Sequence, residues 1–340
     1  MVETAPSAMA PEIGESPAVA ARVIRSRPSI AAIAQRLNVE AAPLAVLCGR
    51  GSSGHAGVFL RYLIETRLHL AVSASAPSVV TAFRKPVTLR NALFIVISQS
   101  GASPHLVAAT RSARDSGART VAIVNLVPSP VADAAEFIIP VEAGTDQSVA
   151  ATKTMIASMA AGAGLIAELA NDKALRSALD RLPGRLDRAP ALDWSKLSAD
   201  LKKASAIFVA SRGLGLGVAY ESALKLAEVL RLPSLAYSAA ELQHGPRAAL
   251  SSRTPVIMMR LADETAAVID AVTAELRESG IAVHLCGGPD SSLPWPGDDH
   301  PATDVITMLV PFYRLIERLA REWGFDPDRP PQLRKVTWTF

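Results

Sequence analysis

Small neutral hydrogen-bonding residues are concentrated in a six-residue stretch, SQSGAS, that begins at Ser98 and ends an apolar run. It supplies Ser98, Gln99, Ser100 and Ser103 and carries no charge. Backbone N–H groups at a helix start attract anions, and hydroxyl and amide groups add neutral donors. Gly101 lets the backbone approach a ligand closely. The stretch therefore predicts a site for a phosphate monoester; the alternative, helix capping, would need only one serine.

A second glycine-rich loop, CGRGSSGHAG, spans residues 48–57 and contains Ser52 and Ser53. It lacks the G-x-G-x-x-G spacing of a dinucleotide loop, and no acidic residue ends the following strand, so NAD binding is disfavoured. The sequence has no G-x-x-x-x-G-K-[ST] motif either. His55 and Cys48 lack the spacing of metal ligands, so no metal site is predicted.

Three charged residues, Glu221, Lys225 and Glu228, have the spacing i, i+4 and i+7 in a stretch with helical character, YESALKLAE. They would share one face of that helix. Two interpretations remain open at this point. Periodicity alone favours a solvent-exposed stripe of ion pairs, whereas the surrounding alanine and leucine residues favour a partly buried stripe that could do chemistry.

Two further ionisable residues lie outside this helix. His244 precedes a Gly-Pro turn in AELQHGP, where an imidazole would face a cleft and could act as an acid or base near neutral pH. Lys335 lies in the C-terminal segment PPQLRKVTWTF. Most tails fray, but apolar neighbours such as Trp338 and Phe340 predict that this one is docked.

Short apolar runs that would position these residues alternate with helical segments. This alternation predicts an α/β fold with parallel sheets and helices on both faces of each sheet. Ligands of such sheets bind beyond the carboxyl ends of the strands. Both loops described above follow a predicted strand, so each would lie at such a ligand site. The predicted strands cover residues 44–49, 93–98, 120–125 and 137–142 in the first half and 206–211, 255–260 and 280–286 in the second.

The second half of the chain repeats the first. Arg50 and Arg212 each follow a predicted strand and are 162 residues apart, and Ser98 and Arg260 have the same separation. We therefore predict two copies of one doubly wound domain. The segment matched to SQSGAS is RLADET (260–265), whose two carboxylates would repel a phosphate, so only the first copy should bind one.

The composition is that of a soluble globular protein, with 49% hydrophobic and 20% charged residues and a net charge of +3. No cluster of basic residues indicates nucleic-acid binding. Cys48 and Cys286 each lie in an apolar run, which is typical of a reducing cytosol. Residues 155–170 are apolar but short and contain Glu168, so they predict a buried helix rather than a membrane span. The N-terminus lacks the features of a signal peptide, and we expect a cytoplasmic protein without a membrane partner.

The chain resembles the sugar isomerase (SIS) family, and within it the isomerase half of glucosamine-6-phosphate synthases. The resemblance runs from EIGESP (12–17) to the last residues and rests on SQSGAS, AGTDQSVAATK (143–153), ESALKLAE, AELQHGP and LRKVT. It implies two tandem doubly wound three-layer (αβα) SIS domains. We expect a tail and lead-in helix (1–29), a first SIS domain (30–182), a linker (183–198), a second SIS domain (199–329) and a docked tail that carries Lys335 (330–340).

Substrate-binding roles follow from the resemblance. The SQSGAS loop would contact the phosphate, the glycine-rich loop would lie near the sugar, and one residue of the 143–153 segment would contribute backbone contacts. The implied residues are Ser98, Gln99, Ser100 and Ser103 of the first, Ser52 and Ser53 of the second, and Val149 of the third.

Catalytic roles are implied in the same way. Glu228 would move a proton between C1 and C2 of the sugar, with Glu221 and Lys225 beside it. His244 would open the ring from a neighbouring subunit, which requires at least a homodimer. Lys335 would meet the carbonyl carbon, either as a Schiff base or by stabilising enediolate charge. No metal or organic cofactor is implied.

Departures from the family pattern shape the expected reaction. Ala102 and Ala151 replace a Glu and a Ser, and Arg334 replaces a small residue, which affects expected contacts with the sugar. The sequence has no counterpart of the synthase's glutaminase domain and so resembles stand-alone members. We therefore expect an isomerising deaminase that converts glucosamine 6-phosphate and water to fructose 6-phosphate and ammonia. The alternatives are a fructosamine-6-phosphate deglycase, a phosphosugar isomerase and a phosphosugar-sensing regulator.

Overall fold

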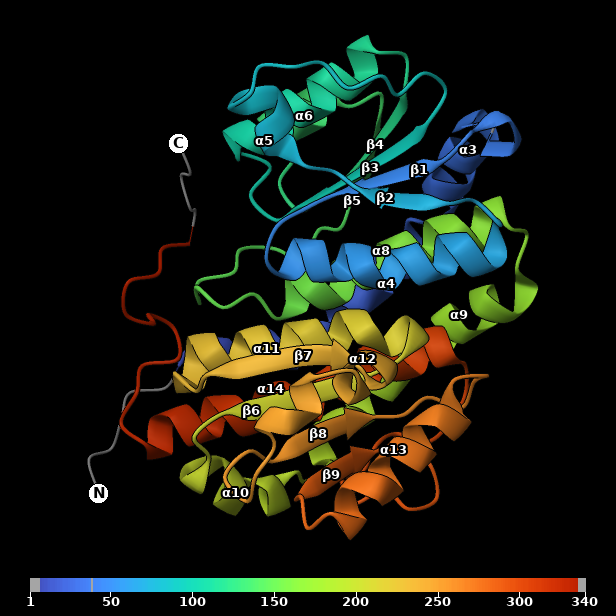
Figure 1. Cartoon of the computed structure of the whole chain (residues 1–340). Helices are drawn as coiled ribbons and strands as arrows, with labels where there is room; N and C mark the ends of the chain where they lie inside the picture. Colours follow the sequence, from blue (N-terminus) through green and yellow to red (C-terminus); the bar gives the residue numbers. More distant parts are fainter. Residues whose placement is uncertain (1–6, 38, 336–340) are drawn as a thin grey trace. The chain divides into compact units, whose positions relative to one another are not determined.

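The computed structural model describes residues 7–37 and 39–335, which form two compact units (Figure 1). The five-stranded unit contains residues 18–37, 39–146, 153–180 and 334–335. The four-stranded unit contains residues 7–17, 147–152 and 181–333. Each unit has its own parallel sheet, in agreement with the α/β fold expected from the sequence.

The sheet of the five-stranded unit has the strand order β2-β1-β3-β4-β5, and all its pairs are parallel. Helices α3, α4 and α8 lie on one side of it, and α5, α6 and α7 on the other. The strands are β1 (Ala45–Cys48), β2 (Val72–Ala74), β3 (Leu93–Ser98), β4 (Arg119–Val124) and β5 (Phe137–Pro140). The helices are α2 (Ser16–Arg25), α3 (Arg27–Leu37), η1 (Val39–Ala41), α4 (Ser52–Arg67), α5 (Pro77–Thr81), α6 (Pro104–Asp115), α7 (Pro130–Ala134), α8 (Lys153–Leu169) and α9 (Lys173–Arg188), the last of which extends into the other unit.

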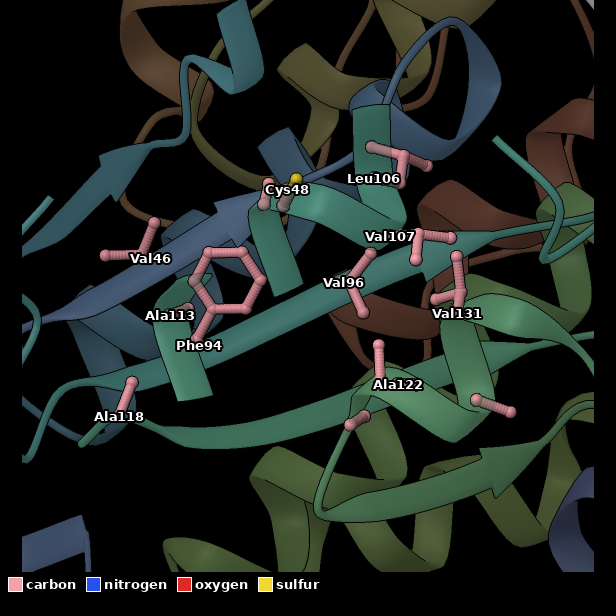
Figure 2. Packing of buried hydrophobic residues seen from close by; sticks show 14 of the residues in the cluster. Val46, Cys48, Phe94, Val96, Leu106, Val107, Ala113, Ala118, Ala122 and Val131 are labelled. Atoms are coloured by element: carbon pink, nitrogen blue, oxygen red, sulfur yellow. The ribbon is translucent and has the colours of Figure 1, made fainter. Parts of the chain in front are cut away.

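Alternate residues of the strands pack against the two helical layers. Phe94 and Val96 of β3 lie in a cluster with Leu106 and Val107 of α6 (Figure 2). Intervening residues face the other layer, where Leu47 lies 3.7 Å from the Cβ position of Gly57 in α4. Because both faces are covered, the strands are continuously apolar rather than alternating. The core therefore fixes β1 and β3 side by side, and with them the loops at their carboxyl ends.

The sheet of the four-stranded unit has the order β7-β6-β8-β9, again all parallel. Helices α11 and α14 pack together, with α11 against β6 and β7, and α12 and α13 contact β6, β8 and β9. The elements are α1 (Met9–Gly14), η2 (Ala189–Ala191), η3 (Ser195–Leu197), α10 (Ser198–Lys203), β6 (Ile207–Ser211), η4 (Gly213–Gly215), α11 (Leu216–Leu230), β7 (Ser234–Ser238), α12 (Ala239–Gln243), η5 (Pro246–Ala249), β8 (Val256–Met259), α13 (Ala266–Glu278), β9 (Val283–Cys286) and α14 (Pro301–Glu322).

The internal repeat is visible in both topology and backbone conformation. Strands β2-β1-β3-β4 correspond in order to β7-β6-β8-β9, and β5 has no counterpart in the second sheet. Gly51 and Gly213, 162 residues apart, both have positive φ, at 52° and 61°, where the chain leaves a matched strand. Helices α6 and α13 start at residues 104 and 266, again 162 apart. The chain is thus two copies of one doubly wound fold.

Three connecting segments were singled out in the sequence. The predicted linker, residues 183–198, contains the end of α9 and two short 3-10 turns, and its Trp194 is buried against Phe312. Before α1, the chain is held at its start by Asp328, whose carboxylate accepts the backbone N–H groups of Ala8 and Met9 at 2.6 and 2.9 Å. Docking of the C-terminal tail was predicted from Val336, Trp338 and Phe340, which lie outside the described residues.

The apolar helix predicted at 155–170 is α8, in which every residue from 153 to 167 is buried. Among the described residues, no helix is both long and apolar enough to span a bilayer. Cys48 and Cys286 are buried free thiols. Burial raises the pKa of Cys48 to about 11 and also raises that of Cys286.

Candidate active site

The SQSGAS loop follows β3 and ends at the first residue before α6. Ser98 is buried, and its Oγ accepts the backbone N–H of Gly101 at 3.0 Å. Ser100 Oγ accepts the N–H of Ala102 at 3.3 Å. Because these oxygens accept backbone protons, their own O–H groups can donate to a ligand. Ser103 occupies the cap position of α6 but makes no capping hydrogen bond, so the simple capping explanation does not account for it.

Glycine is required inside this loop. Gly101 has φ of +62°, and a Cβ at this position would lie 2.2 Å from Ser129 Oγ. Its carbonyl accepts the N–H of Val131 at 2.9 Å, which ties the loop to the start of α7. The loop is thus a tight, uncharged turn fixed from both sides, with hydroxyl groups at the start of a twelve-residue helix.

Ser52 and Ser53 are the first two residues of α4, directly after β1. Gly49 is packed against their turn, because a Cβ there would lie 2.8 Å from the carbonyl group of Ser53. Since β1 and β3 are neighbours and β2 lies on the other side of β1, this loop and SQSGAS meet where the strand order reverses. That position is the usual ligand site of doubly wound sheets. The structure thus brings both predicted loops to one edge of one sheet.

The charged stripe on α11 is buried, so it is not a solvent-exposed row of ion pairs. Side-chain exposure is 0% for Glu221, 1% for Lys225 and 19% for Glu228. Lys225 Nζ lies 3.3 Å from Glu221 Oε1 and 2.6 Å from Glu228 Oε2. The hydroxyl of Tyr313 on α14 donates to Glu221 Oε1 at 3.2 Å.

Burial and charge act in opposite directions on the central lysine. Desolvation lowers the pKa of Lys225, but the carboxylates of Glu221 and Glu228 outweigh it and raise the pKa above its ordinary value. Lys225 therefore remains an ammonium at neutral pH and compensates two carboxylates. Only Glu228 keeps a partly exposed carboxylate, so it is the member of the triad that a ligand can reach.

His244 lies at the end of α12 and is exposed. No hydrogen bond or ion pair joins its ring to the triad or to other described residues. The described part of the chain thus leaves the imidazole unengaged. That His244 reaches the site of a neighbouring subunit stays a prediction.

Lys335 and Val149 have defined surroundings. Lys335 Nζ lies 3.8 Å from Asp146 Oδ2. The N–H of Val149 donates to the carbonyl of Asp328 at 3.0 Å. Lys335 and the SQSGAS loop belong to the five-stranded unit, and the α11 triad, His244 and Val149 to the other.

Several residues that support these groups were missed in the sequence. Tyr313 lies in an apolar stretch of α14 and contacts a residue 92 positions away, so no local pattern marks it. Glu12, on α1, accepts the backbone N–H groups of Gln147 and Ser148, just before Val149. The motif EIGESP did contain Glu12, but only the structure shows what it binds.

A comparison with protein families identifies the fold. The model of the SIS domain matches residues 41–167 and 200–295, more than half of the chain. The chain belongs to the SIS domain family. The two matched segments of the SIS family model fall in the two repeats, one containing SQSGAS and the other containing the α11 triad and His244.

Related proteins extend this SIS assignment. A Silicibacter pomeroyi protein of known structure, provisionally named a phosphosugar isomerase, is 34% identical, with a TM-score of 0.91 over 95% of this chain and 100% of that one. Glutamine–fructose-6-phosphate aminotransferase (isomerizing) of Methanothermobacter thermautotrophicus is 30% identical over 96% of this chain and 56% of its own length. The chain thus spans about half the length of such relatives. A glucosamine-6-phosphate deaminase of Thermotoga maritima, 21% identical with a TM-score of 0.74 over 94% of this chain and all of its own, shares the fold.

Proposed function

We propose that this SIS protein is an isomerising deaminase of an amino-sugar phosphate, with glucosamine 6-phosphate as the substrate. The observation that carries the proposal is the buried Glu221–Lys225–Glu228 triad, whose outer carboxylate alone is accessible. A carboxylate held against a permanent ammonium is suited to move a proton between adjacent carbon atoms. The SQSGAS loop is uncharged and carries hydroxyl groups at the start of a helix, which suits it to bind the phosphate group of the substrate.

The reaction balances with water as the only co-reactant. His244, supplied by a second subunit of a homodimer, opens the sugar ring to give the C1 aldehyde with the amine at C2. Glu228 removes the C2 proton and returns it to C1. The amine also loses one proton and O1 gains one, so the aminoaldehyde becomes a C2 imine with a hydroxyl group on C1. Water adds to this imine, ammonia leaves, and fructose 6-phosphate remains. Lys335 contacts the carbonyl carbon, where an amine can form a Schiff base or stabilise developing negative charge.

An ammonia-release assay tests the proposal. The wild-type protein is assayed with glucosamine 6-phosphate, its epimers and fructosamine 6-phosphates that carry an amino acid. Glu228→Gln should abolish ammonia release while it preserves phosphosugar binding measured by calorimetry. Glu278→Gln, an exposed carboxylate at the end of α13, is the matched control and should retain full activity. Near-wild-type turnover of Glu228→Gln would refute the mechanism.

Aldose–ketose isomerisation without deamination is the second candidate. It is favoured by the 34% identity to the Silicibacter pomeroyi protein, whose whole length this chain covers. The same carboxylate would move the same proton, and only the imine hydrolysis would be missing. Interconversion of neutral sugar phosphates without ammonia from any amino sugar would establish this reaction instead.

A further inference from the structure

One buried carboxylate has no part in the chemistry described so far. The Asp146 side chain, in the segment after β5, is fully buried. Its Oδ2 accepts a hydrogen bond from Thr154 Oγ1 at 2.5 Å, at the start of α8. Its Oδ1 is also buried and has no hydrogen-bond partner among the residues described. A buried carboxylate with a single neutral donor is costly unless a cation lies beside it.

Lys335 supplies that cation. Its Nζ lies 3.8 Å from Asp146 Oδ2, and its side chain is 27% exposed, so the ammonium lies at the edge of the protein interior. The separation is longer than a direct hydrogen bond. The carboxylate therefore attracts the ammonium without fixing it in one rotamer.

The carboxylate itself lies in a segment with a fixed backbone. Asn125, which follows β4, accepts the N–H of Ala143 and donates to the carbonyl of Gly144, both at 2.7 Å. With Thr154 on the other side, Asp146 is tied to two elements of the five-stranded unit. A charge held in this way limits the positions that the flexible four-carbon stem of Lys335 gives its ammonium, without fixing one rotamer.

We propose that Asp146 is a positioning residue that holds the Lys335 ammonium in reach of the substrate carbonyl. The catalytic part of this inference rests on the proposed function, which gives Lys335 its role. Holding the amine in advance lowers the entropic cost of bringing it to the carbonyl carbon. Asp146 itself does not contact the reacting atoms.

The positioning is tested without any substrate. Lysines of the wild type and of Asp146→Asn are acetylated with trace acetic anhydride. Mass spectrometry gives the labelling ratio, which is the acetylation rate of Lys335 divided by that of the exposed Lys196. Loss of the carboxylate should raise this ratio roughly threefold, the effect of a partly screened ion pair. Asp146→Glu, which keeps the charge, should stay near the wild-type ratio. An unchanged ratio in Asp146→Asn overturns the proposal.

A second variant covers the case in which Asp146→Asn fails to fold. Thr154→Val removes the hydrogen bond to the carboxylate but leaves its charge in place. It should raise the labelling ratio by less than twofold, about the effect of one neutral hydrogen bond on a side chain's position. A rise of threefold or more, the effect expected from loss of the whole charge, would contradict the proposal, because the charge would then not be the main determinant.

Turnover gives the kinetic measure. Asp146→Asn should lower kcat about tenfold and leave KM within twofold, since the phosphate loop is untouched and only the amine is less well placed. A change in KM alone would overturn the positioning role while the proposed function stands. If the wild type releases no ammonia from any sugar phosphate, the proposed function fails and the labelling ratio alone decides whether Asp146 positions Lys335.

Discussion

The SQSGAS loop and its matched segment, RLADET at 260–265, have the same place in two copies of one fold but different chemistry. In the first copy, the hydroxyl oxygens of Ser98 and Ser100 accept backbone N–H groups, and the loop contains no charge. In the second copy, the Asp263 carboxylate accepts the N–H of Thr265 at 2.9 Å and its hydroxyl at 2.6 Å. A carboxylate of the chain itself thus lies at the start of the second helix, where the first copy has neutral hydroxyl groups.

The helices that follow the first strand of each copy also differ, in the polar groups that they carry. Helix α4, after β1, begins with Ser52 and Ser53, whereas α11, after β6, buries Glu221 and Lys225. At this matched position, neutral donors thus lie in the first copy and buried ionisable groups in the second. Under the proposed function, the first copy would bind the anion and the second would transfer the proton, so neither copy would need to hold both kinds of group.

The largest effect is expected from the buried lysine of the second copy. Lys225→Met would leave Glu221 and Glu228 without their cation, and removal of one partner from a buried ion pair costs about 3–5 kcal/mol of the free energy of unfolding. Urea unfolding followed by circular dichroism measures the loss. The double variant Lys225→Met/Glu221→Gln should recover part of it. Equal stability of wild type and Lys225→Met would show that the triad is not a buried charge network.

The pH dependence of this effect has a defined sign. The pKa of Lys225 in the folded protein lies above the ordinary 10.5, because the two carboxylates outweigh the desolvation that lowers it. Its contribution to stability is therefore complete below about pH 10 and is lost as the pH rises through the folded pKa. The difference in unfolding free energy between wild type and Lys225→Met should be constant from pH 6 to 9 and shrink above pH 10. A difference that grows with alkaline pH would contradict this assignment.

Features that depend on neighbouring residues could be predicted from the sequence. The strand runs and the spacing of Glu221, Lys225 and Glu228 are patterns of this kind, and the 162-residue repeat is found by comparing two such patterns. The structure contains all of them. Strands β2 and β7 were not predicted because they are edge strands without a buried apolar run, formed by pairing with β1 and β6.

Burial and long-range pairing could not be predicted. Periodicity left open whether the α11 stripe was exposed, because the answer depends on α14, which packs on it from about 90 residues away and supplies Tyr313. The pairing of Asp146 with Lys335 spans 189 residues of sequence, and although both lie in motifs singled out in the sequence, AGTDQSVAATK and LRKVT, neither motif indicates the other as its partner. Such contacts are properties of the packed fold and leave no period or spacing in the chain.

A smaller effect is expected from the glycine that shapes the first loop. Gly101→Ala would place a Cβ 2.2 Å from Ser129 Oγ at a backbone φ of +62°. The strain and the clash should together cost roughly 3 kcal/mol and abolish phosphosugar binding measured by calorimetry. Gly280→Ala is the matched control, because it has φ of +76° but open space around its Cβ, so it should cost only about 1 kcal/mol and leave binding intact. Equal effects of the two variants would show that contact with Ser129 is irrelevant to the loop.

The smallest effects separate the two copies most directly. Ser103 and Thr265 occupy the same position before α6 and α13, and neither makes a capping hydrogen bond, but in the second copy the Asp263 carboxylate accepts the N–H of Thr265. Asp263→Ala should therefore lower the unfolding free energy by about 1 kcal/mol and leave phosphosugar affinity unchanged. Ser103→Ala should do the reverse: stability within about 0.5 kcal/mol of wild type, and affinity reduced roughly fivefold by loss of one donor to the phosphate. If Ser103→Ala loses stability and keeps affinity, the first loop is only a helix cap, and the division of roles between the copies is wrong.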